Sequence, residues 1–178
     1  MAKLQSDNLT LEIKFSRFEN DWIAYEISFL WKDKTIINDE ILKKGIRRKY
    51  GTFLSNDFEK DYLIETIRRV LDTNKPEYWE PVEPDAIIAI YPEIIFPFLN
   101  HWIPVDEKEH KEQDVLELSE DEKQYITNEV FTVIAFIDRY EFEDCKSYSS
   151  EGIALHLIVT REDLEKFVSD LKKEYDSL

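Results

Sequence analysis

Alternating apolar and polar residues predict two long strands near the beginning of the chain. Apolar side chains occupy every second position in two segments, Leu9, Leu11, Ile13, Phe15 and Ile23, Tyr25, Ile27, Phe29, Trp31. Successive side chains of a strand point to opposite faces, so each segment has one apolar and one mainly polar face. The polar residues Glu19 to Asp21 predict a hairpin turn between them, and the β-branched residues within Thr35 to Leu42 predict a third strand.

Helical spacing of apolar residues predicts two helices. The first is expected from about Asp57 to about Asp72, with Asn56 and Glu59 as a capping box and Pro76 as its end. The second is expected to follow Thr160, which forms a capping pair with Asp163. Its apolar stripe is Leu164, Phe167, Val168, Leu171 and Tyr175.

Three further strands are predicted in the second half of the chain. Two segments are apolar at odd and even positions alike, as in central strands whose two faces are both covered: Ala86 to Tyr91 and Val130 to Ile137. The third predicted strand is Ile153 to Val159. The segment Glu77 to Pro84 is expected to be a loop outside any central strand, because prolines lack the amide donor. We therefore predict one α+β domain over residues 1–178, with a largely antiparallel sheet and two helices packed on one face.

The net charge of the chain restricts the kinds of molecule that it can bind. The chain has 39 Asp and Glu against 23 Lys and Arg, a formal net charge of -16, while its 43% of hydrophobic residues can still form a core. Such a surface repels nucleic acids and anionic membranes and attracts cations or a basic protein. The patch from Lys43 to Lys49 has five cations but is expected to be a solvated turn within this acidic chain.

No residue pattern points to a cofactor or a metal. Three glycines are too few and too dispersed for a phosphate-binding loop, and the single Cys145 fits a reducing compartment. The histidines His101, His110 and His156 show no metal-ligand spacing. The first seven residues lack the apolar stretch of a secretory signal, so we expect a soluble, cytoplasmic protein without a membrane segment.

Aromatic residues among carboxylates are the best candidates for a binding site. A ring supplies apolar contact area, and surrounding carboxylates can pair with Lys or Arg of a basic protein. The sequence-based candidates are Tyr78, Trp79, Glu80, Glu83, Asp85, Asp106, Glu107 and Glu109. The last three open a segment, Asp106 to Lys123, that has nine carboxylates and three lysines. The alternative is that Tyr78 and Trp79 cover the core beneath a loop.

The layout of the predicted elements suggests a class of function. The opening hairpin, the helix from Asp57 and the final strand and helix from Gly152 to Tyr175 together resemble the bacterial immunity proteins that accompany cell-wall-associated, contact-dependent toxins. The resemblance implies a stoichiometric inhibitor that covers a cationic toxin domain. It assigns no functional residue to this chain.

Two other classes of function stay open at this point. One is an enzyme that uses carboxylates in a pocket beside His101 and Trp102. The other is a structural protein that assembles through a sheet edge or an aromatic surface. The sequence leaves the oligomeric state and the identity of a partner open.

Overall fold

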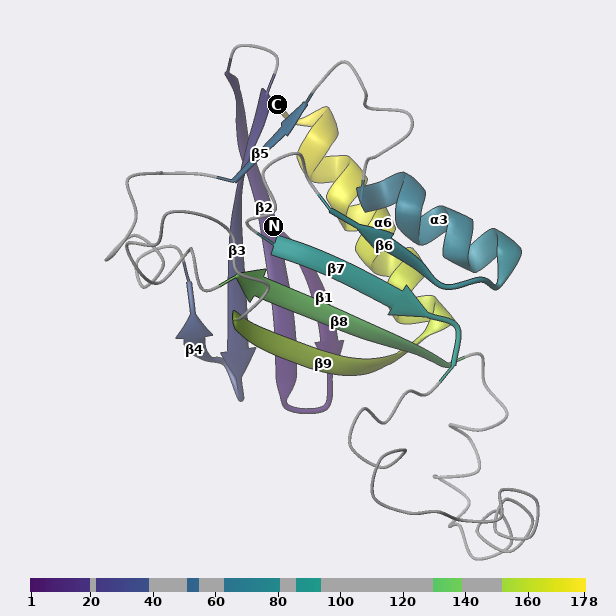
Figure 1. Ribbon diagram of the computed structural model, residues 1–178. Helices are drawn as coiled ribbons and strands as arrows, with labels where there is room; N and C mark the ends of the chain where they lie inside the picture. Colours follow the sequence, from purple (N-terminus) through teal and green to yellow (C-terminus); the bar gives the residue numbers. More distant parts are fainter. Residues whose placement is uncertain (20–21, 39–50, 55–62, 81–85, 94–129, 139–151) are drawn as a thin grey trace, which may run out of the picture.

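The residues that the structure describes form two antiparallel sheets and two helices, and Figure 1 shows their arrangement. The computed structural model describes residues 1–19, 22–38, 51–54, 63–80, 86–93, 130–138 and 152–178. Sheet A contains β1 (Ala2–Ser6), β2 (Leu9–Glu19), β3 (Trp22–Trp31), β4 (Lys34–Ile37) and β5 (Gly51–Leu54). Sheet B contains β6 (Glu77–Trp79), β7 (Ala86–Tyr91), β8 (Val130–Asp138) and β9 (Gly152–Thr160). The helices are α3 (Leu63–Thr73) and α6 (Arg161–Asp176), and the predicted α+β class is confirmed.

Sheet A is built on the predicted hairpin. Its order is β1-β2-β3-β4, and β5 also pairs with β3. The register places Leu11 opposite Phe29, which brings the buried residues of both strands to one face. A two-residue turn joins β3 to β4, and both of its residues, Lys32 (φ 48) and Asp33 (φ 61), are left-handed, as in a type I′ turn.

Sheet B has the order β6-β7-β8-β9, so β7 and β8 are central as predicted. All three strand pairs are antiparallel, and Ile90, Val133 and Leu157 lie in register across β7, β8 and β9. These three side chains are buried. Sheet B therefore turns one apolar face toward the core.

The strands divide into two sheets, whereas the sequence pattern predicted one. Three short strands were also not predicted: β1, β5, and β6, which lies within the segment expected to be a loop. β6 has three residues and is an edge strand. The prediction that this segment lies outside any central strand is therefore confirmed. Alternation identifies strands but does not identify their partners, because pairing depends on contacts between distant residues.

Local signals place the helix ends. The N-cap Thr160 side chain accepts a hydrogen bond from Asp163 N at 3.3 Å, and Thr160 N donates to Asp163 Oδ2 at 2.9 Å, which confirms the predicted capping pair. At the end of α3, Asn74 is left-handed (φ 51) and its N–H donates to Val70 O at 2.9 Å. This is an αL cap, and the helix ends before Pro76. The predicted box at Asn56 and Glu59 lies outside the described residues.

A single hydrophobic cluster joins both sheets and both helices. α6 packs against β1 and β2 of sheet A and against β9 of sheet B, while α3 packs against α6, β6 and β7. Tyr25 of β3 and Trp79 of β6 meet edge to face, with ring centroids 5.9 Å apart. The two sheets are thus held around one core.

Candidate functional site

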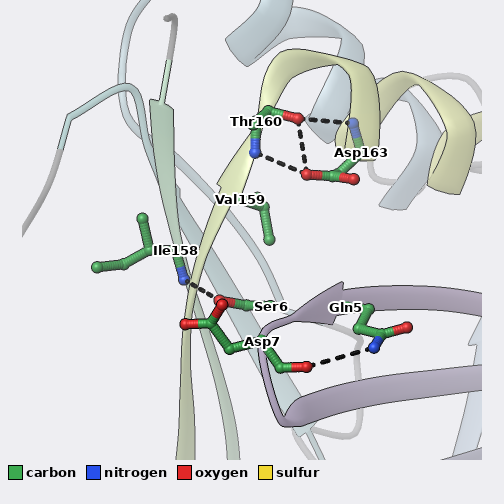
Figure 2. Close-up of a pocket in the computed structure, with 7 residues that line it drawn as sticks. All are labelled: Gln5, Ser6, Asp7, Ile158, Val159, Thr160 and Asp163. Carbon is green, nitrogen blue, oxygen red and sulfur yellow. Dashed lines mark hydrogen bonds between the residues drawn. The ribbon is translucent and has the colours of Figure 1, made fainter. Parts of the chain in front are cut away.

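A pocket lies where the first hairpin of sheet A meets the last strand of sheet B (Figure 2). Its volume is about 310 Å³. It is lined by residues at the ends of β1 and β9 and in the first turn of α6, namely Gln5, Ser6, Asp7, Ile158, Val159, Thr160 and Asp163. The site therefore depends on the docking of the N-terminal strand β1 against β9 and α6, two consecutive elements near the end of the sequence.

Hydrogen bonds fix the walls of this pocket. Ser6 Oγ accepts a hydrogen bond from Ile158 N at 3.3 Å, which joins the two sheets. Asp163 Oδ2 accepts from Thr160 N at 2.9 Å and from Thr160 Oγ1 at 2.7 Å (Figure 2). Gln5 Nε2 donates to Asp7 O at 3.3 Å across the tight turn.

The lining of the pocket is mainly apolar, and its polar groups come from Gln5, Ser6, Asp7, Thr160 and Asp163. Asp163 is half-buried and engaged in the helix cap, whereas the side chain of Asp7 is exposed at the rim. Among the described residues, those that line the pocket include two carboxylates and two hydroxyls, and none of them is Lys, Arg or His.

The structure separates the two aromatic residues predicted to contact a partner. Tyr78 is 65% exposed, and Glu80 is also exposed. Trp79 is only 2% exposed, because side chains alternate along β6 and this ring points into the core against Tyr25. The expectation that Trp79 contacts a partner is therefore wrong for this conformation, and the alternative that it covers the core applies to it.

The remaining predicted contact residues cannot be placed. Glu83, Asp85, Asp106, Glu107 and Glu109 lie outside the described residues. The same applies to the Lys43 to Lys49 patch, Cys145, His101, His110 and Trp102. His156 is half-buried on β9.

Sequence reasoning missed the pocket. The sequence pattern predicts no strand before Leu9 and therefore gives no role to Gln5, Ser6 and Asp7. A signal was present, since Ala2 and Leu4 are buried and alternate with the exposed Lys3 and Gln5. The pairing of this short strand with β2 and its approach to β9 are tertiary features that the local pattern does not contain.

Comparisons with known proteins identify no relative: no family model, curated protein or solved structure matches this chain. Over the described ranges, no helix is both long and apolar enough to cross a membrane. In the same part of the chain, no group of three or more His, Cys, Asp or Glu side chains is arranged to hold a metal ion.

Proposed function

We propose that this chain is a cytoplasmic binding protein that neutralises a basic partner protein, as an immunity protein covers a toxin domain. The observation that supports this function most strongly is the formal net charge of -16 on 178 residues. A surface of this sign attracts a cationic protein over distances longer than contact and repels phosphate backbones.

The described surface adds a contact point of suitable chemistry. Tyr78 projects from the edge strand of sheet B and is followed closely by the exposed Glu80. On the other side of Tyr78, Glu77 is half-buried and its carboxylate lies 3.6 Å from Arg69 Nη2. An exposed ring next to a carboxylate favours a partner that combines an apolar side chain with Lys or Arg.

Charge attraction makes a distinct prediction about kinetics and salt. Steered association reaches rates of about 10⁸–10⁹ M⁻¹s⁻¹ at low ionic strength. Screening over a Debye length of about 10 Å at 0.1 M salt weakens it as ionic strength rises. Binding of the partner is therefore expected to slow markedly as salt is added.

The test is capture of proteins from the native host on the immobilised chain at low salt, followed by elution in a salt gradient. An unrelated protein of similar acidity on the same resin is the control for nonspecific ion exchange. We expect one stoichiometric basic protein that the control does not retain, with an affinity at least about tenfold weaker at 0.5 M than at 0.05 M salt. Recovery of no basic protein, or an affinity independent of salt, would contradict the proposed function.

A further inference from the structure

Sheet B has a second face, opposite the core, that is also mainly apolar. The antiparallel register places Ile87 opposite Phe136 and Tyr91 opposite Thr132 on this side. Its six largest apolar or aromatic side chains are Tyr78, Ile87, Tyr91, Ile134, Phe136 and Ile158, and we call them the outward face of sheet B.

The outward face differs from the core face in exposure. Ile88, Val133 and Leu157 on the core side are 1%, 1% and 0% exposed, and they join the cluster that includes sheet A and both helices. Outward residues such as Ile87 and Phe136 are only half-buried, and Tyr78 is 65% exposed. His156 and the fully buried Thr132 also lie on this side of the sheet. An apolar patch that keeps contact with solvent is nevertheless characteristic of an interaction surface.

Three acidic residues lie at the edge of this apolar face. Glu80 lies next to Tyr78 along the chain, and Asp7 lines the pocket beside Ile158. Glu93 lies at a third point of the rim, because its backbone oxygen accepts a hydrogen bond of 2.7 Å from Thr132 Oγ1. All three acidic residues are exposed, and the strands β6 to β9 contain neither Lys nor Arg.

We propose that the outward face of sheet B binds a segment of a basic protein in which an aromatic or aliphatic side chain is flanked by Lys or Arg. This inference rests on the proposed function and identifies the surface that performs it. The apolar centre supplies desolvated contact area, and the acidic rim pairs with the flanking cations. A second copy of this chain fits poorly, since it would bring two acidic rims together.

Tyr78 is the expected anchor of this interface. It is the most exposed of the large hydrophobic side chains in the described residues, and the sheet holds its backbone in place through pairing with Ala89. Tyrosines in such positions contribute a large share of binding energy at protein interfaces. Replacement of Tyr78 should thus affect binding far more than folding.

A defined peptide tests the surface independently of the natural partner. The probe is a synthetic peptide with one Trp between two pairs of Lys, and the control peptide has Ser in place of Trp. We expect the Trp peptide to bind at least about tenfold more tightly and to shift the NMR signals of Tyr78, Ala89 and Ile134 in the isotope-labelled full chain. Equal affinity of the two peptides, or shifts confined to other elements, would overturn the assignment of this face.

Variants extend the test to the captured protein. Tyr78→Ala should weaken binding about 30-fold, whereas Trp31→Ala, which removes a 47% exposed ring on sheet A, should change it less than about twofold. Glu80→Lys should weaken binding at least about fivefold more than Asp176→Lys, which makes the same charge change at the end of α6.

The outcomes separate the two proposals. Salt-sensitive binding of a basic protein that Tyr78→Ala and Glu80→Lys leave unchanged would overturn the outward face as its site and leave the proposed function standing. Failure to capture any basic protein, together with no binding of either peptide, would overturn both proposals.

Discussion

Trp79 and Tyr78 are consecutive residues of β6 with opposite environments. Trp79 is 2% exposed and packs edge to face on Tyr25, while Tyr78 is 65% exposed. We predict that Trp79→Ala lowers the free energy of unfolding by about 3–5 kcal/mol through loss of buried contacts and formation of a cavity. Tyr78→Ala should change it by less than about 0.5 kcal/mol. Urea denaturation followed by circular dichroism measures both, and similar losses for the two variants would contradict these assignments.

Gly152 is required at its position by close contact rather than by a turn. A Cβ atom added there would lie 1.9 Å from Ile137 O and 2.8 Å from Ile137 C, both of which are backbone atoms. Gly152→Ala must therefore displace β9 from β8, and we predict a loss of about 1–3 kcal/mol in the free energy of unfolding.

The matched control for Gly152 is Ala154→Ser, at an exposed position two residues further along the same strand. Its effect on the free energy of unfolding should stay within about 0.5 kcal/mol. If the Gly152→Ala protein were as stable as this control, β8 and β9 could separate at this end without lowering the free energy of unfolding.

At the scale of elements, the start of α6 depends on the reciprocal cap of Thr160 and Asp163. Thr160→Ala removes the acceptor for Asp163 N and is expected to lower the free energy of unfolding by about 1 kcal/mol. Thr73→Ala is a suitable control, because the Thr73 hydroxyl only donates back to Arg69 O within α3, at 2.6 Å. A Thr160→Ala loss no larger than that of Thr73→Ala, measured by thermal or urea unfolding, would argue against a stabilising cap.

Local patterns predicted the elements that carry their own signals. The alternation from Leu9 to Phe15 identified β2, and Thr160 with Asp163 identified the start of α6. β1, β5 and β6 were missed because strands of five, four and three residues contain too few alternations. For the candidate site, Tyr78 and Glu80 are exposed and their contact with a partner stays a prediction, whereas Trp79 is buried, since the sequence does not say which face of a short edge strand is buried.

At the scale of the whole molecule, one core serves two sheets. Residues of β2, β8 and α6 belong to the same buried cluster. The apolar face of either sheet would therefore become exposed to solvent if the other sheet were removed. We predict that the most slowly exchanging amides of β2 and β8 open with the same free energy, equal to that of global unfolding. Native-state hydrogen exchange measures this. Opening of sheet B at clearly lower free energy than sheet A would instead indicate two independent folding units.

The bond between Ser6 Oγ and Ile158 N has a consequence for behaviour at high protein concentration. β1 and β9 each end their sheet, and a terminal strand presents backbone groups that can recruit a strand from another molecule and start aggregation. Here the two terminal strands approach each other. The Ile158 N–H already donates a hydrogen bond to Ser6 Oγ, so it is not available to pair with a strand from another molecule. The join between the sheets thus also shields these two edge strands from pairing with another molecule.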